Sequence, residues 1–180
     1  MNNKNAPFPY WIIILLITLA IAYFIRHDVF TPYEVQGKSM YPTLYGGEIL
    51  IVNKWIYQFD EVEFGEIIVF HMHEPGKKSK DFIKRVIGLP GDHIIIQAGK
   101  LIRNGELLQE DYINEPMNND RPVDITIPKE KLFVLGDNRN NSKDSREIGL
   151  VDLHDVVGRV EVIIYPWERM RCLSDDDGAN

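Results

Sequence analysis

The segment FIKRVIGLPGDHIIIQAGKLIRNG, residues 82–105, decides the fold class of this chain. It carries short apolar stretches that glycine, proline and asparagine interrupt. Side-chain character alternates along these stretches, and a period of two is typical of β-strands, because successive side chains point to opposite faces. Asn104-Gly105, between two apolar stretches, predicts a two-residue hairpin turn that needs positive φ. The segment therefore predicts short strands and tight turns rather than helix.

The same pattern extends over most of the chain from Thr31 onward. The expected strands are Glu48–Asn53, Glu66–His71, Phe82–Ile87, His93–Ile96, Lys100–Arg103, Val123–Thr126, Lys131–Leu135 and Val156–Tyr165. Turn-rich stretches at Glu74–Lys80 and Glu110–Pro122 are typical of a hairpin tip and a surface loop. We expect an all-β domain over residues 31–168. A polar tail over residues 169–180 follows, and its three consecutive aspartates are typical of disorder.

The composition excludes several classes of protein. With 180 residues and 44% hydrophobic content, the chain fits one domain with its own core. The net charge is −7 and the basic residues are scattered, which argues against a nucleic-acid binder, because phosphate binding needs clustered lysine and arginine. The single cysteine, Cys172, excludes an internal disulfide framework and a CxxC motif. His71 and His73 share a strand face without a third ligand at a helpful spacing, so we expect no metal and no cofactor.

The stretch FPYWIIILLITLAIAYFI, residues 8–25, contains no charged side chain. Its length of about 18 residues lies near the lower end for a helix that spans a bilayer. Aromatic side chains lie at both ends, where amphipathic rings favour the membrane interface. A cleavable signal is the alternative, but the apolar part is longer than a typical h-region and no small-x-small site follows it. We interpret it as a retained anchor that follows a short N-terminus, residues 1–7.

Charge and aromatic residues near the membrane leave two questions open. Lys4 and the free amine on one side of the anchor oppose Arg26 and His27 on the other, so charge counting does not fix the orientation. The run WIYQF, residues 55–59, with Tyr165 and Trp167, fits either contact with lipid or packing in the core. Interfacial and buried aromatic residues look alike in a sequence.

The first motif that carries chemistry is GKSMYPT, residues 37–43. A nucleophilic serine needs an exposed hydroxyl on a turn that also directs its own amide at the developing oxyanion. Gly37 permits close approach of the backbone, and Pro42 restricts the chain that follows. Taken alone, a serine between glycine and proline is more often an ordinary loop residue.

The second motif, FIKRVIGLPGD, residues 82–92, contains Lys84. In a strand, Lys84 shares one face with its apolar neighbours Phe82 and Val86. Burial disfavours the ammonium form, and a lysine that acts as a base near neutral pH needs its pKa lowered from about 10.4 by roughly three units, or about 4 kcal/mol. A solvent-facing strand lysine is the alternative. With a serine, a neutral lysine can replace the histidine of a hydrolytic triad.

The third motif is GDNRNNSKDSR, residues 136–146, with Gly149 shortly after it. It follows the strand-like KLFVL and is too polar for the core, so its side chains must satisfy one another or bind water. Such loops build sites, although a plain turn rich in Asp and Asn has the same composition. The match Asn140-Asn141-Ser142 to a glycosylation acceptor is interpreted as fortuitous.

Behind the N-terminal apolar run, these three motifs closely resemble the type I signal peptidase (leader peptidase) family. The resemblance rests on SM-x-PT, KR-x-x-G-x-PGD and GDN-x-x-x-S-x-DSR, and it covers the anchor and nearly all of the chain from Tyr33 to Trp167. It implies a serine endopeptidase that removes signal peptides from secreted preproteins at the outer face of the membrane. It also implies that Ser39 is the nucleophile and Lys84 its general base.

The resemblance also implies supporting roles and a topology. Ser142 hydrogen-bonds the lysine amine, and Asp144 and Arg146 form an ion pair near the site. Some members have a serine two positions before the nucleophile that assists the oxyanion. Gly37 holds that position here, as in the single-span members typical of Gram-positive bacteria. The family fold is an all-β, partly open domain, with the N-terminus in the cytoplasm and the domain outside the cell membrane.

The expected substrates carry small side chains one and three residues before the cut, the Ala-x-Ala pattern of secretory signals. Expected pocket walls are Val35, Met40 and residues beside Lys84, such as Ile83 or Val86, and an extended substrate would add to a strand edge. Two alternatives differ in class. One is a catalytically silent, membrane-anchored binding module, and the other is a self-cleaving Ser-Lys switch protease, which normally has a DNA-binding N-terminal domain.

Overall fold

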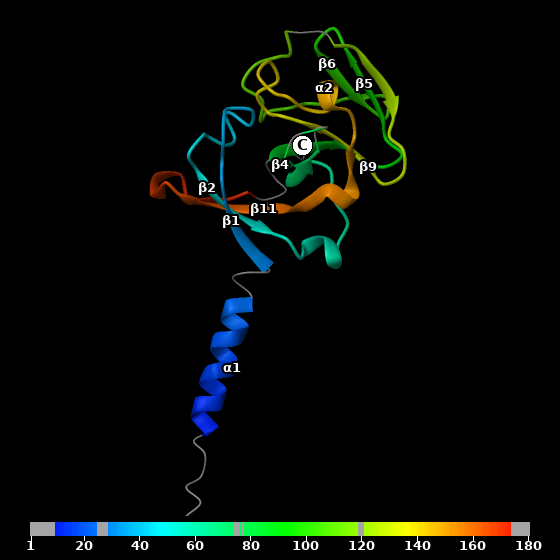
Figure 1. Ribbon diagram of the computed structural model, residues 1–180. Coiled ribbons are helices and arrows are strands. Elements are labelled where there is room, and N and C mark those ends of the chain that lie inside the picture. The colour runs from blue at the N-terminus through cyan, green and yellow to red at the C-terminus, as the bar shows by residue number, and fades with distance from the viewer. Residues whose placement is uncertain (1–9, 25–28, 74–75, 77, 119–120, 174–180) are drawn as a thin grey trace, which may run out of the picture.

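The computed structural model describes residues 10–24, 29–73, 76, 78–118 and 121–173. It consists of an N-terminal helix, α1, and a β domain that follows it (Figure 1). The expected N-terminus, residues 1–7, lies outside the described residues, as do both ends of the expected anchor, Arg26 and His27 beyond it, and residues 174–180 of the tail.

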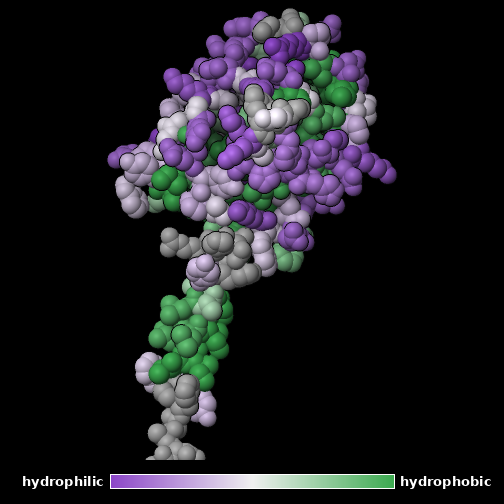
Figure 2. Space-filling view, in the orientation of Figure 1, coloured by the Kyte–Doolittle hydropathy of each residue, from purple (hydrophilic) through white to green (hydrophobic). Residues whose placement is uncertain are grey.

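Helix α1 spans Tyr10–Phe24 and carries almost only apolar side chains. Figure 2 shows it as a continuous hydrophobic surface, in contrast with the largely hydrophilic surface of the β domain. Its 15 residues are fewer than a membrane crossing needs, and the part of the chain that the structure describes contains no helix that is both long and apolar enough for one.

The β domain contains two antiparallel sheets. The larger has the order β1-β2-β11-β3-β4-β9-β10, with β12 also paired to β11, and the smaller has the order β7-β6-β5-β8. The larger sheet comprises β1 (Phe30–Glu34), β2 (Ile49–Asn53), β3 (Ile67–Met72), β4 (Lys80–Gly88), β9 (Lys131–Leu135), β10 (Val151–Asp152), β11 (Val156–Tyr165) and β12 (Arg171–Cys172). The smaller comprises β5 (His93–Gln97), β6 (Lys100–Arg103), β7 (Glu106–Leu107) and β8 (Val123–Thr126). Short helical turns are α2 (Ser145–Ile148), η2 (Ile56–Gln58), η3 (Leu153–Asp155) and η4 (Trp167–Arg169).

The structure confirms a mostly β fold, and each expected strand is present within two residues of its expected ends. Asn104 and Gly105 have φ of 53° and 86°, as the hairpin turn between β6 and β7 requires. Sequence patterns missed β1, because its residues FTPYE contain a proline and no apolar alternation. They also missed β7, β10 and β12, which are too short to show a period.

Three apolar clusters fix the position of β4 in the domain. Val86 packs in a cluster with Ile68 and Phe70 of β3, while Ile83 packs against a second cluster around Met40 and Leu44. The third cluster joins β4 and β9 to the smaller sheet. Strand β4 is therefore paired on both sides, with β3 and with β9, and is among the most strongly held segments of the domain.

The C-terminal boundary differs from the expectation of a tail that begins at residue 169. Arg169 forms an ion pair with Glu48 and lies 3.8 Å from the ring of Tyr45, while Cys172 pairs with Val162 of β11. Leu173 is buried in the core. Residues 169–173 are therefore part of the domain. Glu48, the partner of Arg169, is 121 residues away, and the strand that pairs with β11 is only two residues long, so neither left a local pattern in the sequence.

The aromatic residues that the sequence left open divide into two groups. The Tyr57 hydroxyl donates to Glu66 at 2.7 Å, and its ring packs against a core cluster. Phe59 is 83% exposed and Trp167 is 74% exposed, and Tyr165 is also exposed. Packing in the core is thus confirmed for Tyr57, whereas contact with lipid remains a prediction for the exposed rings.

Candidate functional site

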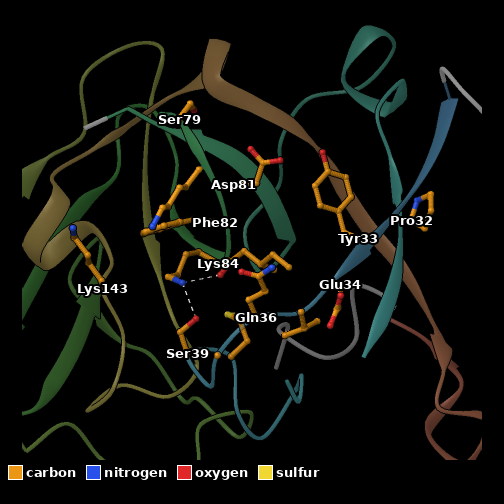
Figure 3. A pocket seen from close by; sticks show the side chains of 15 residues that line it. Pro32, Tyr33, Glu34, Gln36, Ser39, Ser79, Asp81, Phe82, Lys84 and Lys143 are labelled. Atoms are coloured by element: carbon orange, nitrogen blue, oxygen red, sulfur yellow. Dashed lines mark hydrogen bonds between the residues drawn. The ribbon is translucent and has the colours of Figure 1, made fainter. Parts of the chain in front are cut away.

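Ser39 and Lys84 meet, although 45 residues separate them in the sequence. The amine Nζ of Lys84 donates a hydrogen bond to Oγ of Ser39 at 2.8 Å (Figure 3). The same amine donates to the main-chain oxygen of Ile83 at 2.9 Å. A hydroxyl in direct contact with an amine is the arrangement that a nucleophile and its base require.

The surroundings of Lys84 favour its neutral form. The residue is only 3% exposed, and burial lowers the pKa of its amine to about 8, while the carboxylates of Asp144 and Asp137 act in the opposite direction. Desolvation exceeds the attraction to these two acids, because each is bound to an arginine. With this pKa, about a tenth of Lys84 is unprotonated at pH 7 and about half at pH 8.

The alternation expected for the Lys84 strand is present. Phe82 and Val86 pack in one apolar cluster and Ile83 in another, and Lys84 lies opposite Ile68 of β3. Lys84 is paired with Ile68 on one side, and pairing with β9 on the other side begins at the next residue, Arg85, so the lysine backbone has little freedom. The expectation of a solvent-facing strand lysine is thereby excluded for this residue.

The loop that carries Ser39 is attached to the loop after β9. The main-chain amide of Asn138 donates to the carbonyl oxygen of Ser39 at 3.0 Å, and the Asn138 side chain donates to that of Lys38, also at 3.0 Å. Gly136 lies directly beneath, where a Cβ atom would overlap the Ser39 carbonyl oxygen and the side chain of Ser142. A glycine is thus needed at position 136 so that three segments can meet.

Ser142 lies in this junction, but its expected hydrogen bond to the lysine is not formed. The hydrogen bonds of the Lys84 amine go to Ser39 and Ile83. The Ser142 hydroxyl oxygen is buried against Gly136 and has no hydrogen-bond partner among the described residues. A buried hydroxyl without a partner is costly, and such groups mark sites where a partner is gained later.

Asp144 and Arg146 form the ion pair that the motif led us to expect. Both guanidinium contacts are short, Nε to Oδ1 at 2.8 Å and Nη2 to Oδ2 at 2.7 Å, and the Asp144 side chain is fully buried. Asp144 also accepts from the amide of Gly136 at 3.1 Å, and Arg146 donates to the carbonyl of Arg139. The pair therefore fixes the backbone of the loop that holds Ser39.

A second buried ion pair was missed from the sequence. Arg85 donates to both carboxylate oxygens of Asp137, at 2.9 and 2.8 Å, and Thr43 donates to the same carboxylate at 2.5 Å. The ring of Tyr112 lies 4.0 Å from the Arg85 guanidinium. Arg85 follows Lys84 in the chain, so the two residues point to opposite faces of β4 and connect it to two loops. The sequence offered one signal for this pair, which is that Arg85 directly follows the lysine that was expected to be buried.

A cleft of about 780 Å³ contains Ser39 and Lys84. Its two walls are residues 32–37, which are the end of β1 and the chain after it, and residues 79–84, which include the first half of β4. Of the expected pocket walls, Val35, Met40 and Ile83 line this cleft. The remaining candidate, Val86, is buried in the core cluster. A cleft between two strand segments has the shape that an extended peptide fills.

Comparison with known proteins gives a consistent result. The family model described as signal peptidase, peptidase S26, matches residues 9–167. Signal peptidase I P of Bacillus subtilis subsp. natto is 39% identical over 180 residues, which cover 94% of this chain and 96% of that protein. Signal peptidase IB of Staphylococcus aureus is 35% identical over 178 residues, with 89% and 91% covered. A solved structure of a signal peptidase I from Enterococcus faecalis is 32% identical, covers 56% of this chain and 97% of its own, and has a TM-score of 0.45.

Proposed function

The chain belongs to the signal peptidase family, peptidase S26, and we propose that it removes signal peptides from secreted preproteins with Ser39 as nucleophile and Lys84 as general base. Membership of this family makes it a serine peptidase and a hydrolase. One observation carries the choice of residues, the distance of 2.8 Å between the amine of a buried lysine and a serine hydroxyl in the same cleft.

The reaction follows from this contact. With Lys84 neutral, the Ser39 hydroxyl gives its proton to Nζ as Oγ attacks the scissile carbonyl carbon. The resulting ammonium then protonates the leaving amine nitrogen, so the peptide bond breaks and an ester to Ser39 remains. A water molecule gives a proton to Lys84 and attacks this ester, which releases the signal peptide and restores the serine hydroxyl.

Ser142 is proposed to hold the amine during this cycle. When Lys84 is neutral and accepts the serine proton, two N–H groups remain on Nζ. One of them has a partner in the Ile83 carbonyl oxygen. The buried Ser142 hydroxyl, which lacks a partner among the described residues, is the proposed acceptor for the other. Asp144 and Arg146 support both residues by fixing the loop between Gly136 and Arg146.

The backbone amide of Ser39 is the proposed donor to the oxyanion. Gly37, two residues earlier, has no side chain that supplies a second donor, and its φ of 82° is a conformation that glycine adopts at low cost. The loop between Gly37 and Thr43 is held by its bonds to Asn138, which supports a fixed direction for this amide.

The substrate is proposed to lie extended between β1 and β4. β1 is the outermost strand of the larger sheet, and residues 80–84 of β4 pair with β3 but not with β9, so both have main-chain groups available toward the cleft. Val35, Met40 and Ile83 would contact the small side chains one and three residues before the cut. Apolar walls of this kind favour alanine over charged side chains, which would lose their hydration.

The proposed location is the cell membrane, with one span. We assign the anchor to residues 8–25, the short N-terminus to the cytoplasm, and the catalytic domain that begins near residue 31 to the outer face. The apolar surface of α1 supports this assignment (Figure 2). The exposed aromatic rings of Phe59, Tyr165 and Trp167 are proposed to contact lipid, since rings of this kind favour the membrane interface.

Cleavage of a purified preprotein in detergent tests the proposal. The substrate carries alanine one and three residues before the cut. We expect the wild-type protein to cut it, and we expect Ser39→Ala and Lys84→Ala to leave it intact. Lys131→Ala is the matched control, because Lys131 is also a strand lysine but pairs with Asp152 away from the cleft. Equal cutting by wild type and Lys84→Ala would show that the assigned base is wrong.

The two alternatives predict other outcomes in the same assay. A silent binding module retains the preprotein and cuts nothing. A self-cleaving protease shortens its own chain in a Lys84-dependent manner and leaves the preprotein intact. The presence of both Ser39 and Lys84 in one cleft favours the peptidase over the module.

A further inference from the structure

Gly136, which lies beneath the carbonyl of Ser39, is held at both of its main-chain groups. Its amide donates to Asp144, the acid that the third motif pairs with Arg146. Its carbonyl oxygen accepts from Nε of Arg139 at 3.1 Å. The orientation of Gly136, and with it the contact to the nucleophile loop, therefore depends on two arginines rather than one.

The acid that binds Arg139 comes from outside the three motifs. The Arg139 side chain is fully buried, and its Nη1 and Nη2 atoms donate to the two carboxylate oxygens of Glu110 at 2.5 and 2.6 Å. The Glu110 side chain is itself only 7% exposed. A guanidinium stays protonated, and a buried one is stable only beside a countercharge. The position of Arg139 therefore depends on Glu110.

Tyr112 orients Glu110 from two residues further along the chain. Its hydroxyl donates to Oε1 of Glu110 at 2.7 Å. Its ring packs against the apolar cluster that joins the smaller sheet to β4 and β9. The centre of the ring lies 4.0 Å from the Arg85 guanidinium and 5.8 Å from that of Arg139. The carboxylate of Glu110 is thus directed by a ring that is packed in the core.

The segment that carries Glu110 contacts the loop after β9 a second time. The amide of Asn118 donates to Oδ1 of Asn140 at 2.8 Å, and Nδ2 of Asn140 donates to the carbonyl oxygen of Pro116 at 3.1 Å. Residues 110–118 belong to the stretch that its turn-rich sequence assigns to a surface loop. They are therefore attached to the loop after β9 at two consecutive residues, Arg139 and Asn140.

We infer that Glu110, oriented by Tyr112, is a positioning residue for the cleavage reaction and acts through Arg139 on the loop after β9, residues 136–146. This inference rests on the proposed function and deepens it, because that loop holds the carbonyl of Ser39. Without the Glu110 carboxylate, the guanidinium of Arg139 loses the two acceptors that direct it. The donor to the Gly136 carbonyl is then no longer fixed, and the nucleophile loop loses part of its support.

Glu110→Gln tests the inference, because the amide keeps the size of the side chain and removes its charge and one acceptor oxygen. We expect kcat for preprotein cleavage to fall by roughly ten-fold, since the loop moves by less than the 1 Å that has larger costs. KM should stay at the wild-type value, because residues 110–118 lie outside the lining of the cleft. The midpoint of the pH–rate profile should also stay, because the charges that act on the pKa of Lys84 are those of Asp144 and Asp137.

Glu66→Gln is the matched control, because Glu66 is a buried acid with the same two kinds of partner. It accepts from the Tyr57 hydroxyl at 2.7 Å and from Nη1 of Arg159 at 2.8 Å. These partners belong to η2 and β11 rather than to the loop after β9. Both variants should unfold at a lower temperature than the wild type, and both are assayed well below their unfolding midpoints. Only Glu110→Gln should lose kcat.

A double substitution shows whether Glu110 acts through Arg139. Arg139→Met removes the guanidinium and keeps an unbranched side chain. In this background Glu110→Gln should cause no further decrease in kcat, because the arginine that the carboxylate directs is gone. Tyr112→Phe removes one hydrogen bond and keeps the ring, so it should lower kcat by roughly three-fold. This variant decides the same question if Arg139→Met does not fold.

Each outcome decides the inference. It is supported by a loss of kcat in Glu110→Gln and Tyr112→Phe that Glu66→Gln does not show and that disappears in the Arg139→Met background. It is overturned by an unchanged kcat in Glu110→Gln or Tyr112→Phe, by an equal loss in Glu66→Gln, by a change in KM or in the pH midpoint instead, or by a further decrease in the double variant. The proposed function stands in all these cases, since the wild type still cleaves the preprotein. Failure of the wild type to cleave it overturns the proposed function and this inference together.

Discussion

Lys84 and Ser39 are held by two different kinds of structure. Lys84 belongs to β4, which is paired with β3 over residues 80–85 and with β9 over residues 85–88, and which is packed against apolar clusters. Ser39 lies on a loop whose position depends on hydrogen bonds to Asn138 and on the absence of a side chain at Gly136. The strand determines the protonation of the base, while the loop contacts determine where the nucleophile points.

Substitutions on the strand and substitutions on the loop should therefore have different effects on the kinetics. Changes on the strand side should alter the pKa of the base, and changes on the loop side should alter the rate at a fixed pKa. The distinction holds because burial is the largest influence on Lys84, and burial comes from β4 and its neighbours. The loop affects the distance and angle of the attack, to which reaction rates are very sensitive.

Replacing the base itself should have the largest effect. Lys84→Arg keeps the positive charge and most of the volume, but a guanidinium stays protonated and accepts no proton. We expect kcat for preprotein cleavage to fall by at least about 10⁴-fold, the scale seen when a member of a catalytic unit is removed. Lys131→Arg, on the exposed surface of β9, is the control and should cleave at the wild-type rate. Measurable turnover by Lys84→Arg would contradict the role of a neutral lysine.

Gly136→Ala should displace the loop that carries Ser39. The added Cβ overlaps the Ser39 carbonyl oxygen and the Ser142 side chain, so the nucleophile loop must move. We expect kcat to fall on the order of 10²-fold, because displacement by about 1 Å has costs of this size. The midpoint of the pH–rate profile should stay where it is in the wild type.

A control substitution at a second glycine separates the effect of this clash on the catalytic site from a general effect on folding. Gly158→Ala also forces a Cβ against a backbone oxygen, that of Asn53, but on the β11 and β2 pair. It should lower thermal stability without the loss of kcat in the folded fraction. A similar loss of kcat in both variants would mean that position 136 matters only for folding.

Asn138→Ala should have a smaller effect on the same side. The change removes the side-chain bond to the Lys38 carbonyl and leaves the main-chain bond to Ser39. One hydrogen bond contributes about 1 kcal/mol, so we expect roughly a five-fold decrease in kcat. Steady-state kinetics at saturating substrate measure the decrease in kcat. A decrease as large as that in Gly136→Ala would contradict the view that the Asn138 side chain contributes only one of several contacts that hold the loop.

Asp144→Asn should show where the two sides of the site are coupled, because Asp144 lies on the loop while its charge acts on the pKa of Lys84. Burial lowers the pKa of Lys84 to about 8 while the Asp144 charge acts to raise it. Without this carboxylate the pKa should fall below 8, and the acid limb of the pH–rate profile should move to lower pH. The maximal rate above the limb should also fall, because Asp144 holds Gly136 and Arg146, but a shift of the limb to higher pH would contradict the electrostatic role.

Sequence patterns predicted the strand side of the site better than the loop side. The alternation around Lys84 is local, so five neighbouring residues predict which face it occupies. Asp137 and Arg85 are 52 residues apart, and no local pattern indicates that they form a buried pair. The junction of Gly136, Ser142 and the Ser39 carbonyl is equally long-range. The family motifs predicted the pairing of Ser39 with Lys84 and the Asp144–Arg146 ion pair, but not the Arg85–Asp137 pair or the junction at Gly136.

The same reason explains the errors at the ends of the fold. Strand β1 contains Pro32, and residues 169–173 contain only a two-residue strand, so neither shows a readable period. Both became strands by pairing with a neighbouring strand, β2 for the first and β11 for the second, which their own residue patterns do not indicate. One of these segments, β1, forms a wall of the cleft.

The pH dependence of kcat/KM for preprotein cleavage tests the central claim, that a buried, neutral Lys84 is the base for Ser39, most directly. The active form has an unprotonated amine, so the rate should rise as pH increases through the pKa of the folded protein. The account predicts a single ionisation with a midpoint near 8. A midpoint near 10, the value of an ordinary exposed lysine, would contradict it.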